Sequence, residues 1–322
     1  MSAIAITGAT GFLGGALCRR LLDEGQPVIA LGRDTDKLAA LRALGAISVQ
    51  ADLSLGAPEL KGEINAVVHC AALSSAWGKP EEFRAANVTG TSAALKLAKV
   101  GGATRFVHIS TPSIYFRFRD QVRVREDADL PSPVNAYAET KLEAETLVQG
   151  DHGIESLVLR PRGLYGTGDT ALLPRLLRAA RAGPLPLIRG GTAETDLTHV
   201  DDVVDAVLAA LNAPAGLSQR VFNISGGEPL PVKRIAESAG ERAGITVRWR
   251  TIPAPVVFAA ARAMEAAAHL TPGRPEPRIT AYGAGLFAFT QTLDLDAART
   301  YLGWRPRVSF EEGLARTFGT IA

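Results

Sequence analysis

The first half of the chain alternates short apolar runs with longer segments in which apolar residues recur every three or four positions. Nearly continuous apolar runs are typical of strands that are buried on both faces of a parallel sheet. We therefore expect strands at residues 3–7, 27–31, 46–51, 64–70, 103–110 and 154–160. The longer segments have the 3.6-residue period of amphipathic helices and predict helices at residues 12–24, 35–44, 80–100 and 134–150.

Strands that alternate with helices of this length are joined by right-handed crossovers, which predicts an α/β fold with a Rossmann-type, doubly wound parallel sheet. After Pro161 the elements become shorter, and we expect helices at 201–211 and 232–243 and a strand at 221–224. Residues 1–160 are expected to form a dinucleotide-binding domain. Residues 161–322 are expected to form mainly a smaller C-terminal α/β substrate-binding lobe, with some segments returning to the Rossmann domain.

The composition excludes several classes of protein. Hydrophobic residues make up 47% of the chain, and 35 basic and 33 acidic residues are interspersed, so neither disorder nor a nucleic-acid partner is expected. Cys18 and Cys70 lie in apolar stretches, which predicts two buried thiols and no metal site. The longest apolar run, 254–270, contains Arg262 and Glu265 and is shorter than the roughly 20 residues that a bilayer span needs. With no visible export signal, we expect a cytoplasmic protein without a membrane span.

A glycine-rich loop follows the first predicted strand and opens the first predicted helix. Glycines there leave room for a dinucleotide's pyrophosphate to approach the backbone N–H groups at a helix N-terminus. The residues expected to contact the cofactor are Gly8, Thr10, Gly11, Phe12, Leu13 and Gly14.

The end of the second strand selects between the two nicotinamide cofactors. Arg33 suits the 2′-phosphate of NADP, whereas Asp34 could instead accept hydrogen bonds from the ribose of NAD. We expect NADP, with NAD still possible. Further along the same sheet edge, Asp52 and Leu53 are expected to meet the adenine, and Ala71 and Ala72 to lie beside the cofactor.

Tyr137 and Lys141 are four residues apart on a predicted helix and therefore share one face. A free tyrosine has a pKa near 10, so acid–base work near neutrality needs about three units of depression, which a neighbouring ammonium and an oxidised nicotinamide can provide. Thr111 and Ser113 add hydroxyls after the fifth strand, at the edge where ligands bind in such sheets.

The glycine loop, these hydroxyls and the Tyr/Lys pair together resemble the extended short-chain dehydrogenase/reductase family, also called the NAD-dependent epimerase/dehydratase family. The resemblance runs along the whole chain. Its further motifs are Asn87-Val88-Thr89-Gly90-Thr91, Leu159-Arg160-Pro161, His199-Val200-Asp201-Asp202-Val203, and Leu302-Gly303-Trp304-Arg305-Pro306 followed by Glu312-Gly313-Leu314.

The resemblance assigns roles by position. Tyr137 would be the general acid/base, and Lys141 would lower its pKa and hold the nicotinamide ribose. Thr111 would hydrogen-bond the substrate oxygen, Asn87 would position a water of the proton relay, and Pro161 would border the cofactor. Helices 80–100 and 134–150 correspond to those through which relatives pair, so a homodimer is expected.

Departures from the family pattern narrow the choice of activity. Pro112-Ser113 follows Thr111 where sugar dehydratases carry Asp-Glu, and Gly163 and Thr195 stand where epimerases carry an asparagine and an arginine that bind the nucleotide sugar. Other segments resemble the 3β-hydroxysteroid dehydrogenase-like branch, particularly its 2-alkyl-3-oxoalkanoate reductases; they are Ala76-Trp77-Gly78, Ser110-Thr111-Pro112-Ser113, Leu159-Arg160-Pro161-Arg162 and Gly227-Glu228-Pro229-Leu230-Pro231.

We therefore expect an NAD(P)-dependent oxidoreductase that interconverts a ketone and a secondary alcohol on a bulky apolar or keto-acid substrate. Trp77, Ser113 and Arg162 are the candidate substrate contacts, and Arg162 is a hypothetical partner for a substrate carboxylate. Two alternatives stay open: a nucleotide-sugar epimerase or dehydratase that recycles its NAD, and a non-catalytic regulator that senses NADP.

Overall fold

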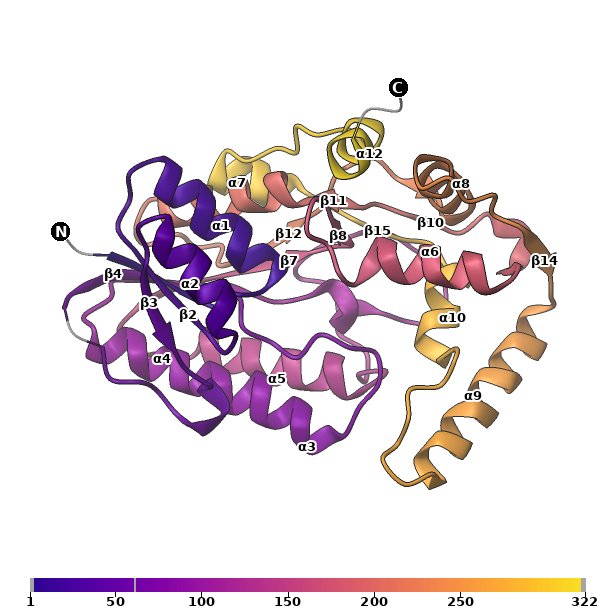
Figure 1. Ribbon diagram of the computed structural model, residues 1–322, viewed down its shortest axis with the longest axis horizontal. Helices are drawn as coiled ribbons and strands as arrows, with labels where there is room; N and C mark the ends of the chain where they lie inside the picture. Colours follow the sequence, from indigo (N-terminus) through magenta and orange to yellow (C-terminus); the bar gives the residue numbers. More distant parts are fainter. Residues whose placement is uncertain (1–2, 61, 320–322) are drawn as a thin grey trace.

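The computed structural model describes residues 3–60 and 62–319, and its centre is a parallel sheet of seven strands (Figure 1). The strand order is β12-β7-β5-β4-β1-β2-β3, which is the doubly wound arrangement predicted from the alternating pattern. The strands are β1 (Ala3–Thr7), β2 (Val28–Gly32), β3 (Ile47–Gln50), β4 (Ile64–His69), β5 (Arg105–Ile109), β7 (Glu155–Pro161) and β12 (Val221–Ile224).

Helices cover both faces of this sheet (Figure 1). On one face α1 (Phe12–Asp23), α2 (Thr35–Ala43) and α7 (Val200–Leu211) share a hydrophobic core with alternate strand residues. On the other face α4 (Gly90–Val100) and α5 (Ala136–Gln149) pack on the remaining strand residues. In β5, for example, Val107 belongs to the first core and Phe106 to the second, as the period of two requires.

The helix predicted at 80–100 is continuous but irregular. It begins as α3 (Pro80–Phe83), passes through a π-helical segment, η2 (Arg84–Thr89), and continues as α4. Such π segments are uncommon and occur often at functional sites. Here the segment contains Asn87, whose side chain is buried.

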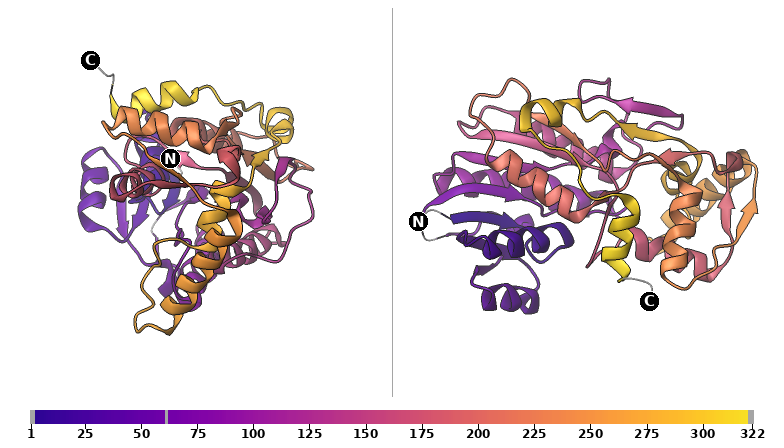
Figure 2. Two further views of the ribbon diagram at one scale, coloured as in Figure 1. Left: turned by 90° about the vertical axis from the view of Figure 1, so that its right-hand side faces the viewer. Right: turned by 90° about the horizontal axis from the view of Figure 1, so that it is seen from above.

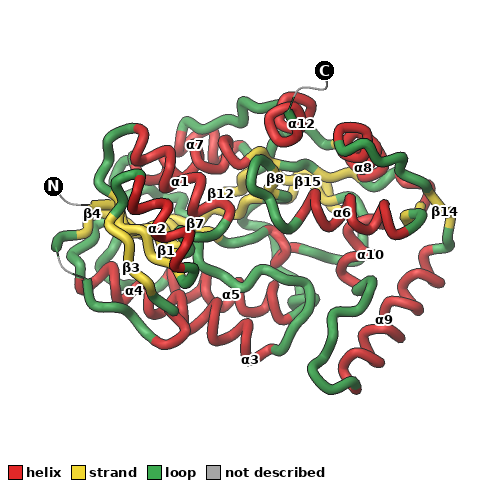
Figure 3. The backbone as a smooth tube through the Cα atoms, viewed as in Figure 1, coloured by secondary structure: helices red, strands yellow, loops and turns green. Residues whose placement is uncertain are grey.

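Shorter elements extend beyond the large sheet toward α6 and α8 (Figure 3). A four-stranded sheet joins β13 (Leu230–Pro231), β10 (Glu194–Thr195), β15 (Gln291–Leu293) and β6 (Gln121–Val124), and two-stranded sheets pair β11 (Thr198–His199) with β8 (Leu164–Tyr165) and β14 (Trp249–Thr251) with β9 (Leu185–Leu187). The remaining helices are α6 (Leu172–Ala182), α8 (Val232–Arg242), α9 (Ala254–Leu270), α10 (Ala281–Ala288), α11 (Asp296–Leu302) and α12 (Phe310–Phe318), and the 3-10 turns are η1 (Leu53–Leu55), η3 (Pro112–Tyr115) and η4 (Arg189–Gly191).

The helix α9 extends away from the body of the molecule, on the side far from the N-terminus (Figures 1 and 2). Within the described residues, none of the helices combines the length and the apolar character that crossing a membrane requires. Of the two cysteines, Cys18 is buried as expected, but Cys70 is half-buried because it lies where β4 has just ended.

The register of the sheet brings the carboxyl ends of its strands to one edge. Thr7 at the end of β1 pairs with Leu31 of β2 and His69 of β4, and His69 in turn pairs with His108 of β5. The next pairing is between β5 and β7, where Ile109 pairs with Leu159. The loops that follow these five strands therefore lie side by side, and they contain most of the predicted site residues.

Candidate active site

The glycine loop between β1 and α1 is closed so tightly that side chains do not fit. Gly8 has a φ of 67°, and a Cβ atom there would lie 2.7 Å from the backbone nitrogen of Ala71. A Cβ atom on Gly14 would lie 2.3 Å from the carbonyl oxygen of Gly8, so Gly14 allows the first turn of α1 to pack against the loop. Gly11 caps α1 without a side-chain hydrogen bond, and the first turn has no acidic residue. This cradle fits the pyrophosphate of a dinucleotide, which hydrogen-bonds to such free N–H groups.

The other loop residues have distinct surroundings. Thr10 packs against the end of β2, where a Cβ on Gly32 would lie 2.6 Å from its Cγ2 atom. Phe12 is half-buried, whereas the side chain of Leu13 belongs to the hydrophobic core. Leu13 can therefore offer a cofactor its backbone but not its side chain.

Asp34 and Arg33, the two charged residues after β2, differ in the contacts that they make with other protein groups. Asp34 caps α2 by accepting a hydrogen bond from the backbone N–H of Lys37 at 3.1 Å, and this bond holds the pKa of its carboxyl below the ordinary value. The side chain of Arg33 is 77% exposed, and its nearest carboxylate is Asp52 at 3.9 Å. Asp52 itself caps η1 by accepting hydrogen bonds from Ser54. The arginine is thus the freer of the two charges for a ligand.

Hydrogen bonds to Thr7 of β1 and to Asn87 hold the loop after β4 in place. The backbone N–H of Ala71 donates to the hydroxyl of Thr7 at 3.3 Å, and Ala72 is exposed beside it. Asn87 accepts a hydrogen bond from the backbone N–H of Leu73 at 2.7 Å and donates to the carbonyl of Leu73 at 3.2 Å. Its amide also donates to Thr140 of α5 at 3.0 Å. Both ends of the Asn87 amide bind protein groups, so this side chain holds the loop to α5, and the positioning of a water by Asn87 stays a prediction.

Tyr137 lies in the first turn of α5, which begins after the capping residue Asn135. Burial raises the pKa of Tyr137, and hydrogen bonding with the side chains of Thr111 and Ser74 acts in the opposite direction. In the protein alone burial has the larger effect, and the lowering that the sequence predicted, by Lys141 together with an oxidised nicotinamide, stays a prediction. The phenol is therefore held in its protonated form, with two hydroxyl groups beside it.

Lys141, one turn later, is buried, and its ammonium points at the end of β5. Its Nζ atom donates to the carbonyl oxygen of Ile109 at 2.6 Å and lies 3.2 Å from Nε2 of His108. Burial lowers the pKa of Lys141 to about 8, while the charge of Glu145 raises it. His108 stacks on His69, and burial keeps the pKa of both imidazoles far below the ordinary value, so both rings are neutral near pH 7.

Thr111 begins a chain of hydroxyl groups. It caps η3 by accepting from the backbone N–H of Ser113 at 3.2 Å, and it donates to the Ser113 hydroxyl at 3.0 Å. The Ser113 hydroxyl also lies 2.8 Å from the phenol of Tyr282, which comes from α10. The chain therefore links the loop after β5 to a helix in the second half of the molecule.

Arg162 and Trp77 also contact elements from the second half. Arg162, which follows β7, donates from Nε to the hydroxyl of Thr195 at 2.7 Å and from Nη1 to the side-chain oxygen of Gln291. Trp77 donates from its indole nitrogen to the carbonyl of Arg274 at 3.0 Å and packs against His269 with ring centroids 4.5 Å apart.

A buried ion pair between β7 and α5 holds the elements of the site together. Arg160 in β7 binds Glu145 of α5 through two nitrogens, and its guanidinium lies 4.8 Å from the ring centre of Tyr115. The hydroxyl of Ser110 donates to the same carboxylate at 2.7 Å. This pair fixes α5, with Tyr137 and Lys141, against the ends of β5 and β7. Pro161 follows Arg160 directly and pairs with Ile224 of β12, so its backbone is held in the sheet beside Arg162.

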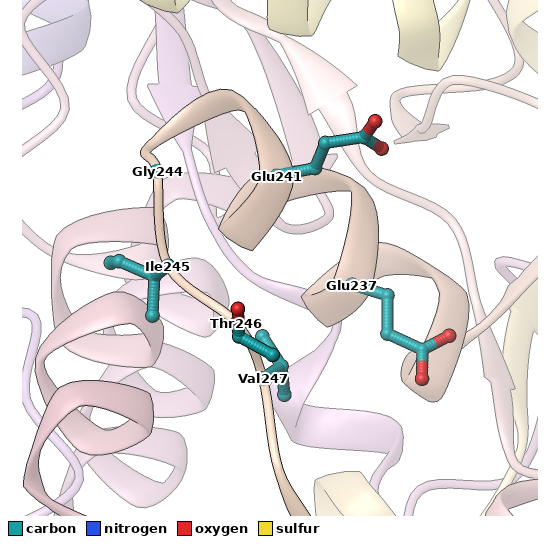
Figure 4. A pocket seen from close by; sticks show the side chains of 6 residues that line it. All are labelled: Glu237, Glu241, Gly244, Ile245, Thr246 and Val247. Carbon is teal, nitrogen blue, oxygen red and sulfur yellow. The ribbon is translucent and has the colours of Figure 1, made fainter.

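Sequence reasoning missed two residues of this site, Ser74 and Tyr282. Ser74 lies in the loop after β4 with no regular element to indicate it. Tyr282 lies on α10, whose short apolar sequence has no helical period, so neither its helix nor its direction was visible. A hollow elsewhere contains none of the site residues: it lies between α8 and the loop that follows, and is lined by Glu237, Glu241, Gly244, Ile245, Thr246 and Val247 (Figure 4).

Comparison with known proteins identifies the family of this chain. The family model of the NAD dependent epimerase/dehydratase family matches residues 4–225. A 2-alkyl-3-oxoalkanoate reductase of Stenotrophomonas maltophilia is 32% identical, with 97% of each chain covered. A 4-hydroxy-2-methyl-3-oxo-4-farnesyl-3,4-dihydroquinoline-1-oxide ketoreductase of Stigmatella aurantiaca is 33% identical, with 96% of this chain and 93% of the relative covered.

Among solved structures, the UDP-glucuronic acid 4-epimerase of Bacillus cereus in complex with NAD matches with a TM-score of 0.75 and 25% identity. The match covers 98% of this chain and 97% of the epimerase. The shared fold and the sequence relatives lead to one assignment. The chain belongs to the NAD dependent epimerase/dehydratase family, in the branch that includes the 2-alkyl-3-oxoalkanoate reductases.

Proposed function

We propose that this protein is an NADP-preferring oxidoreductase that interconverts a ketone and a secondary alcohol on a bulky apolar or keto-acid substrate. The observation that carries the proposal is that Tyr137 lies beside the hydroxyls of Thr111 and Ser74, at the strand edge that also contains the glycine cradle. The reductase and ketoreductase names of the sequence relatives support the same reaction class.

The protonated phenol suits ketone reduction. A bound nicotinamide supplies the hydride in this direction and accepts it in the reverse direction. Tyr137, whose pKa burial raises, donates its proton to the substrate oxygen, while the hydroxyl of Thr111, which must exchange its bond to Ser113, donates a hydrogen bond to the same oxygen. In alcohol oxidation Tyr137 takes the proton back, and this step needs the phenolate.

Lys141 and Asn87 act on the site in different ways. The ammonium of Lys141 would stabilise the Tyr137 phenolate and bind the ribose hydroxyls of the cofactor, for which it must exchange its contact with Ile109. Asn87 is a positioning residue, because its amide holds the loop that contains Ser74 against α5.

The choice of NADP rests on the charges after β2. Asp34 is occupied as the cap of α2, whereas the guanidinium of Arg33 is exposed and can pair with a 2′-phosphate. Asp52 and Leu53 would border the adenine, and Gly8, Thr10, Gly11, Gly14, Ala71, Ala72 and Pro161 would line the rest of the cofactor site, together with Phe12 and the backbone of Leu13.

The substrate would lie between the sheet edge and residues of 161–322, which we propose as mainly the substrate-binding lobe. Trp77 and a group of aromatic rings in the loop after η3, on α9 and on α10 offer an apolar lining for a bulky substrate. In that group Phe116 meets Tyr282 edge-on with ring centres 5.0 Å apart, and Phe118 meets Phe258 in the same way at 5.6 Å.

An epimerase is the second candidate, because the similar solved structure is a UDP-glucuronic acid 4-epimerase. Two observations weigh against it. Gly163 has a φ of 54°, and a Cβ atom there would lie 2.6 Å from a side-chain carbon of Leu197, so the asparagine of epimerases does not fit. The hydroxyl of Thr195 replaces their arginine and accepts a hydrogen bond from Arg162. A non-catalytic sensor is disfavoured by the intact Thr111, Tyr137 and Lys141.

The test is net oxidation of NADPH, followed by its absorbance, with a series of bulky ketones and 3-oxo acids. Tyr137→Phe should lower kcat by about 10²- to 10⁴-fold, the usual contribution of a general acid. Tyr301→Phe, an exposed tyrosine on α11, is the matched control and should leave kcat unchanged. An epimerase would convert its sugar substrate with no net change in NADPH, and full activity in Tyr137→Phe would remove the catalytic assignment.

We also propose a homodimer that forms through α4 and α5, as the resemblance implies. Sedimentation velocity at several concentrations tests this proposal, and a single monomeric species would contradict it.

A further inference from the structure

A second cluster of polar side chains, Ser113, Arg162 and Tyr282, lies near Tyr137. The proton transfer proposed for Tyr137 does not use these side chains. Tyr282 is near enough to raise the pKa of Tyr137 by its charge when ionised, and Arg162 is near enough to lower the pKa of Tyr282. The Ser113 hydroxyl connects this cluster to Thr111 through two hydrogen bonds of 3.0 and 2.8 Å. The three side chains come from η3, α10 and the loop after β7, so the fold brings them together from distant parts of the sequence.

Arg162 has an unusual environment for a buried cation. Its exposed fraction is 7%, and the two groups that accept its hydrogen bonds, the Thr195 hydroxyl and the Gln291 amide, are both neutral. Within residues 3–60 and 62–319, no carboxylate lies at ion-pair distance from its guanidinium. Arg160, two residues earlier, is also buried, but it is paired with the buried carboxylate of Glu145, as buried arginines usually are. A guanidinium taken out of water without a paired anion is costly to the fold.

The charge of Asp196 acts on Arg162, but its carboxylate makes no hydrogen bond to the guanidinium. One carboxylate oxygen accepts a hydrogen bond from Ser225 at 2.8 Å, and the other, Oδ1, is buried without a hydrogen-bond partner. Burial raises the pKa of Asp196 and lowers that of Arg162. The charge of Arg162 acts against the rise for Asp196, and the charge of Asp196 acts against the fall for Arg162. The guanidinium therefore has a negative charge acting on it but no carboxylate in direct contact among the described residues, and an anion that binds at Arg162 would supply that contact.

We propose that Arg162, Tyr282 and Ser113 form a subsite for the carboxylate of a 3-oxo or 3-hydroxy acid. This inference rests on the proposed function and adds the group by which the substrate is selected. In such an acid a single carbon separates the reacting carbon from the carboxylate. When the reacting oxygen lies at Tyr137 and Thr111, the carboxylate reaches the next groups of the hydroxyl chain, Ser113 and Tyr282. Arg162 is near enough for its charge to act on Tyr282.

The chemistry of each group fits an anionic ligand. The Nη2 atom of Arg162 makes no hydrogen bond to the part of the protein that the structure describes, so it is available to a carboxylate oxygen. Burial raises the pKa of Tyr282, which keeps its hydroxyl protonated and able to donate. An ester or simple ketone would leave the guanidinium unpaired, which gives discrimination between a free acid and its neutral analogue.

The experiment compares a 2-alkyl-3-hydroxyalkanoate with its methyl ester, both oxidised with NADP⁺. The wild-type enzyme should prefer the acid. Arg162→Gln should lower kcat/KM for the acid by about 10- to 100-fold, the value of a charge-assisted hydrogen bond, and change the ester little. Tyr282→Phe should lower it by about 3- to 10-fold, also selectively for the acid. Arg162→Lys keeps the charge and should recover part of the preference.

The outcomes separate this inference from the proposed function. Equal losses on acid and ester in Arg162→Gln and Tyr282→Phe would overturn the subsite while leaving the redox activity established. Absence of NADP-linked turnover of any alcohol by the wild-type enzyme would instead reject the proposed function. If Arg162→Gln does not fold, Tyr282→Phe is judged by the same criterion. Stabilisation against heat by UDP-glucuronic acid but not by the hydroxy acid, seen in the wild-type protein and lost in Arg162→Gln, would assign Arg162 to a nucleotide sugar and would also overturn the proposal.

Discussion

The ammonium of Lys141 lies 3.2 Å from the Nε2 atom of His108, in a space where both side chains are buried. Because burial keeps His108 neutral, its Nε2 atom accepts this hydrogen bond and the ring proton lies on Nδ1, which has no hydrogen-bond partner. His69 and Cys70 face the same ammonium from the end of β4, and Glu145 faces it from its own helix. A neutral imidazole thus stabilises the charged form of a lysine whose pKa burial lowers.

The first prediction concerns the pH dependence of reduction. The pKa of Lys141 is about 8, so the ammonium is present below pH 8 and is lost as the pH rises through this value. We expect kcat/KM for NADPH to fall above about pH 8. In His108→Phe the ammonium loses an acceptor, and the fall should begin at lower pH. His108→Gln can place an oxygen near the position of Nε2, so its kcat/KM should begin to fall at about the same pH as that of the wild type. Identical pH profiles for all three proteins would contradict the prediction.

The second prediction concerns stability. In the unfolded chain a lysine titrates near 10.4, so between pH 8 and 10.4 the unfolded state binds more protons and stability rises with pH. Lys141→Met removes the buried charge and should be inactive yet more stable at pH 7, by at most about 3 kcal/mol. Its advantage should shrink as the pH rises above 8. Urea unfolding at pH 7 and pH 9.5 measures both effects, and a Lys141→Met protein less stable than the wild type at pH 7 would contradict this account.

The third prediction uses two glutamates of α5. Glu145→Gln leaves Arg160 buried without its carboxylate and should cost about 3–5 kcal/mol of unfolding free energy. Glu143→Gln is the matched control, because Glu143 pairs with Arg84 at 2.6 Å on the surface, where such pairs contribute about 0–1 kcal/mol. Urea denaturation of the two variants tests the difference, and equal losses would mean that burial does not strengthen the Arg160 pair.

Much of the first half of the fold was predictable because its elements are long and regularly patterned. Six strands and their helices appear within about two residues of the expected positions, since buried parallel strands and amphipathic helices leave unambiguous periods. The second half was less predictable. Strands of two or three residues have no period to detect, and β6 pairs with β15 through Gln121 and Gln291, which are far apart in the sequence.

The residues of the candidate site likewise differ in whether the sequence could predict them. Tyr137, Lys141 and Thr111 were visible from the sequence because they occupy fixed places on, or just after, regular elements. Tyr282 reaches Ser113 across 169 residues, so its place depends on how α10 packs on Phe116 at Gly285, where a side chain would not fit. The environment of Tyr137 was also out of reach, because burial and hydrogen bonding, which set the direction of its pKa shift, are properties of the folded chain.

The last prediction concerns the choice of coenzyme. Arg33→Ala removes the exposed guanidinium that we assign to the 2′-phosphate, so KM for NADPH should rise by about 10- to 100-fold while KM for NADH changes little. Because the side chain is exposed, salt should screen the interaction, and the difference between wild type and variant should narrow as KCl is raised. Arg42→Ala, at the far end of α2, is the control and should leave both constants unchanged. An equal rise for both coenzymes would indicate that Arg33 supports the loop rather than the phosphate, and a wild-type preference for NADH would overturn the assignment of NADP.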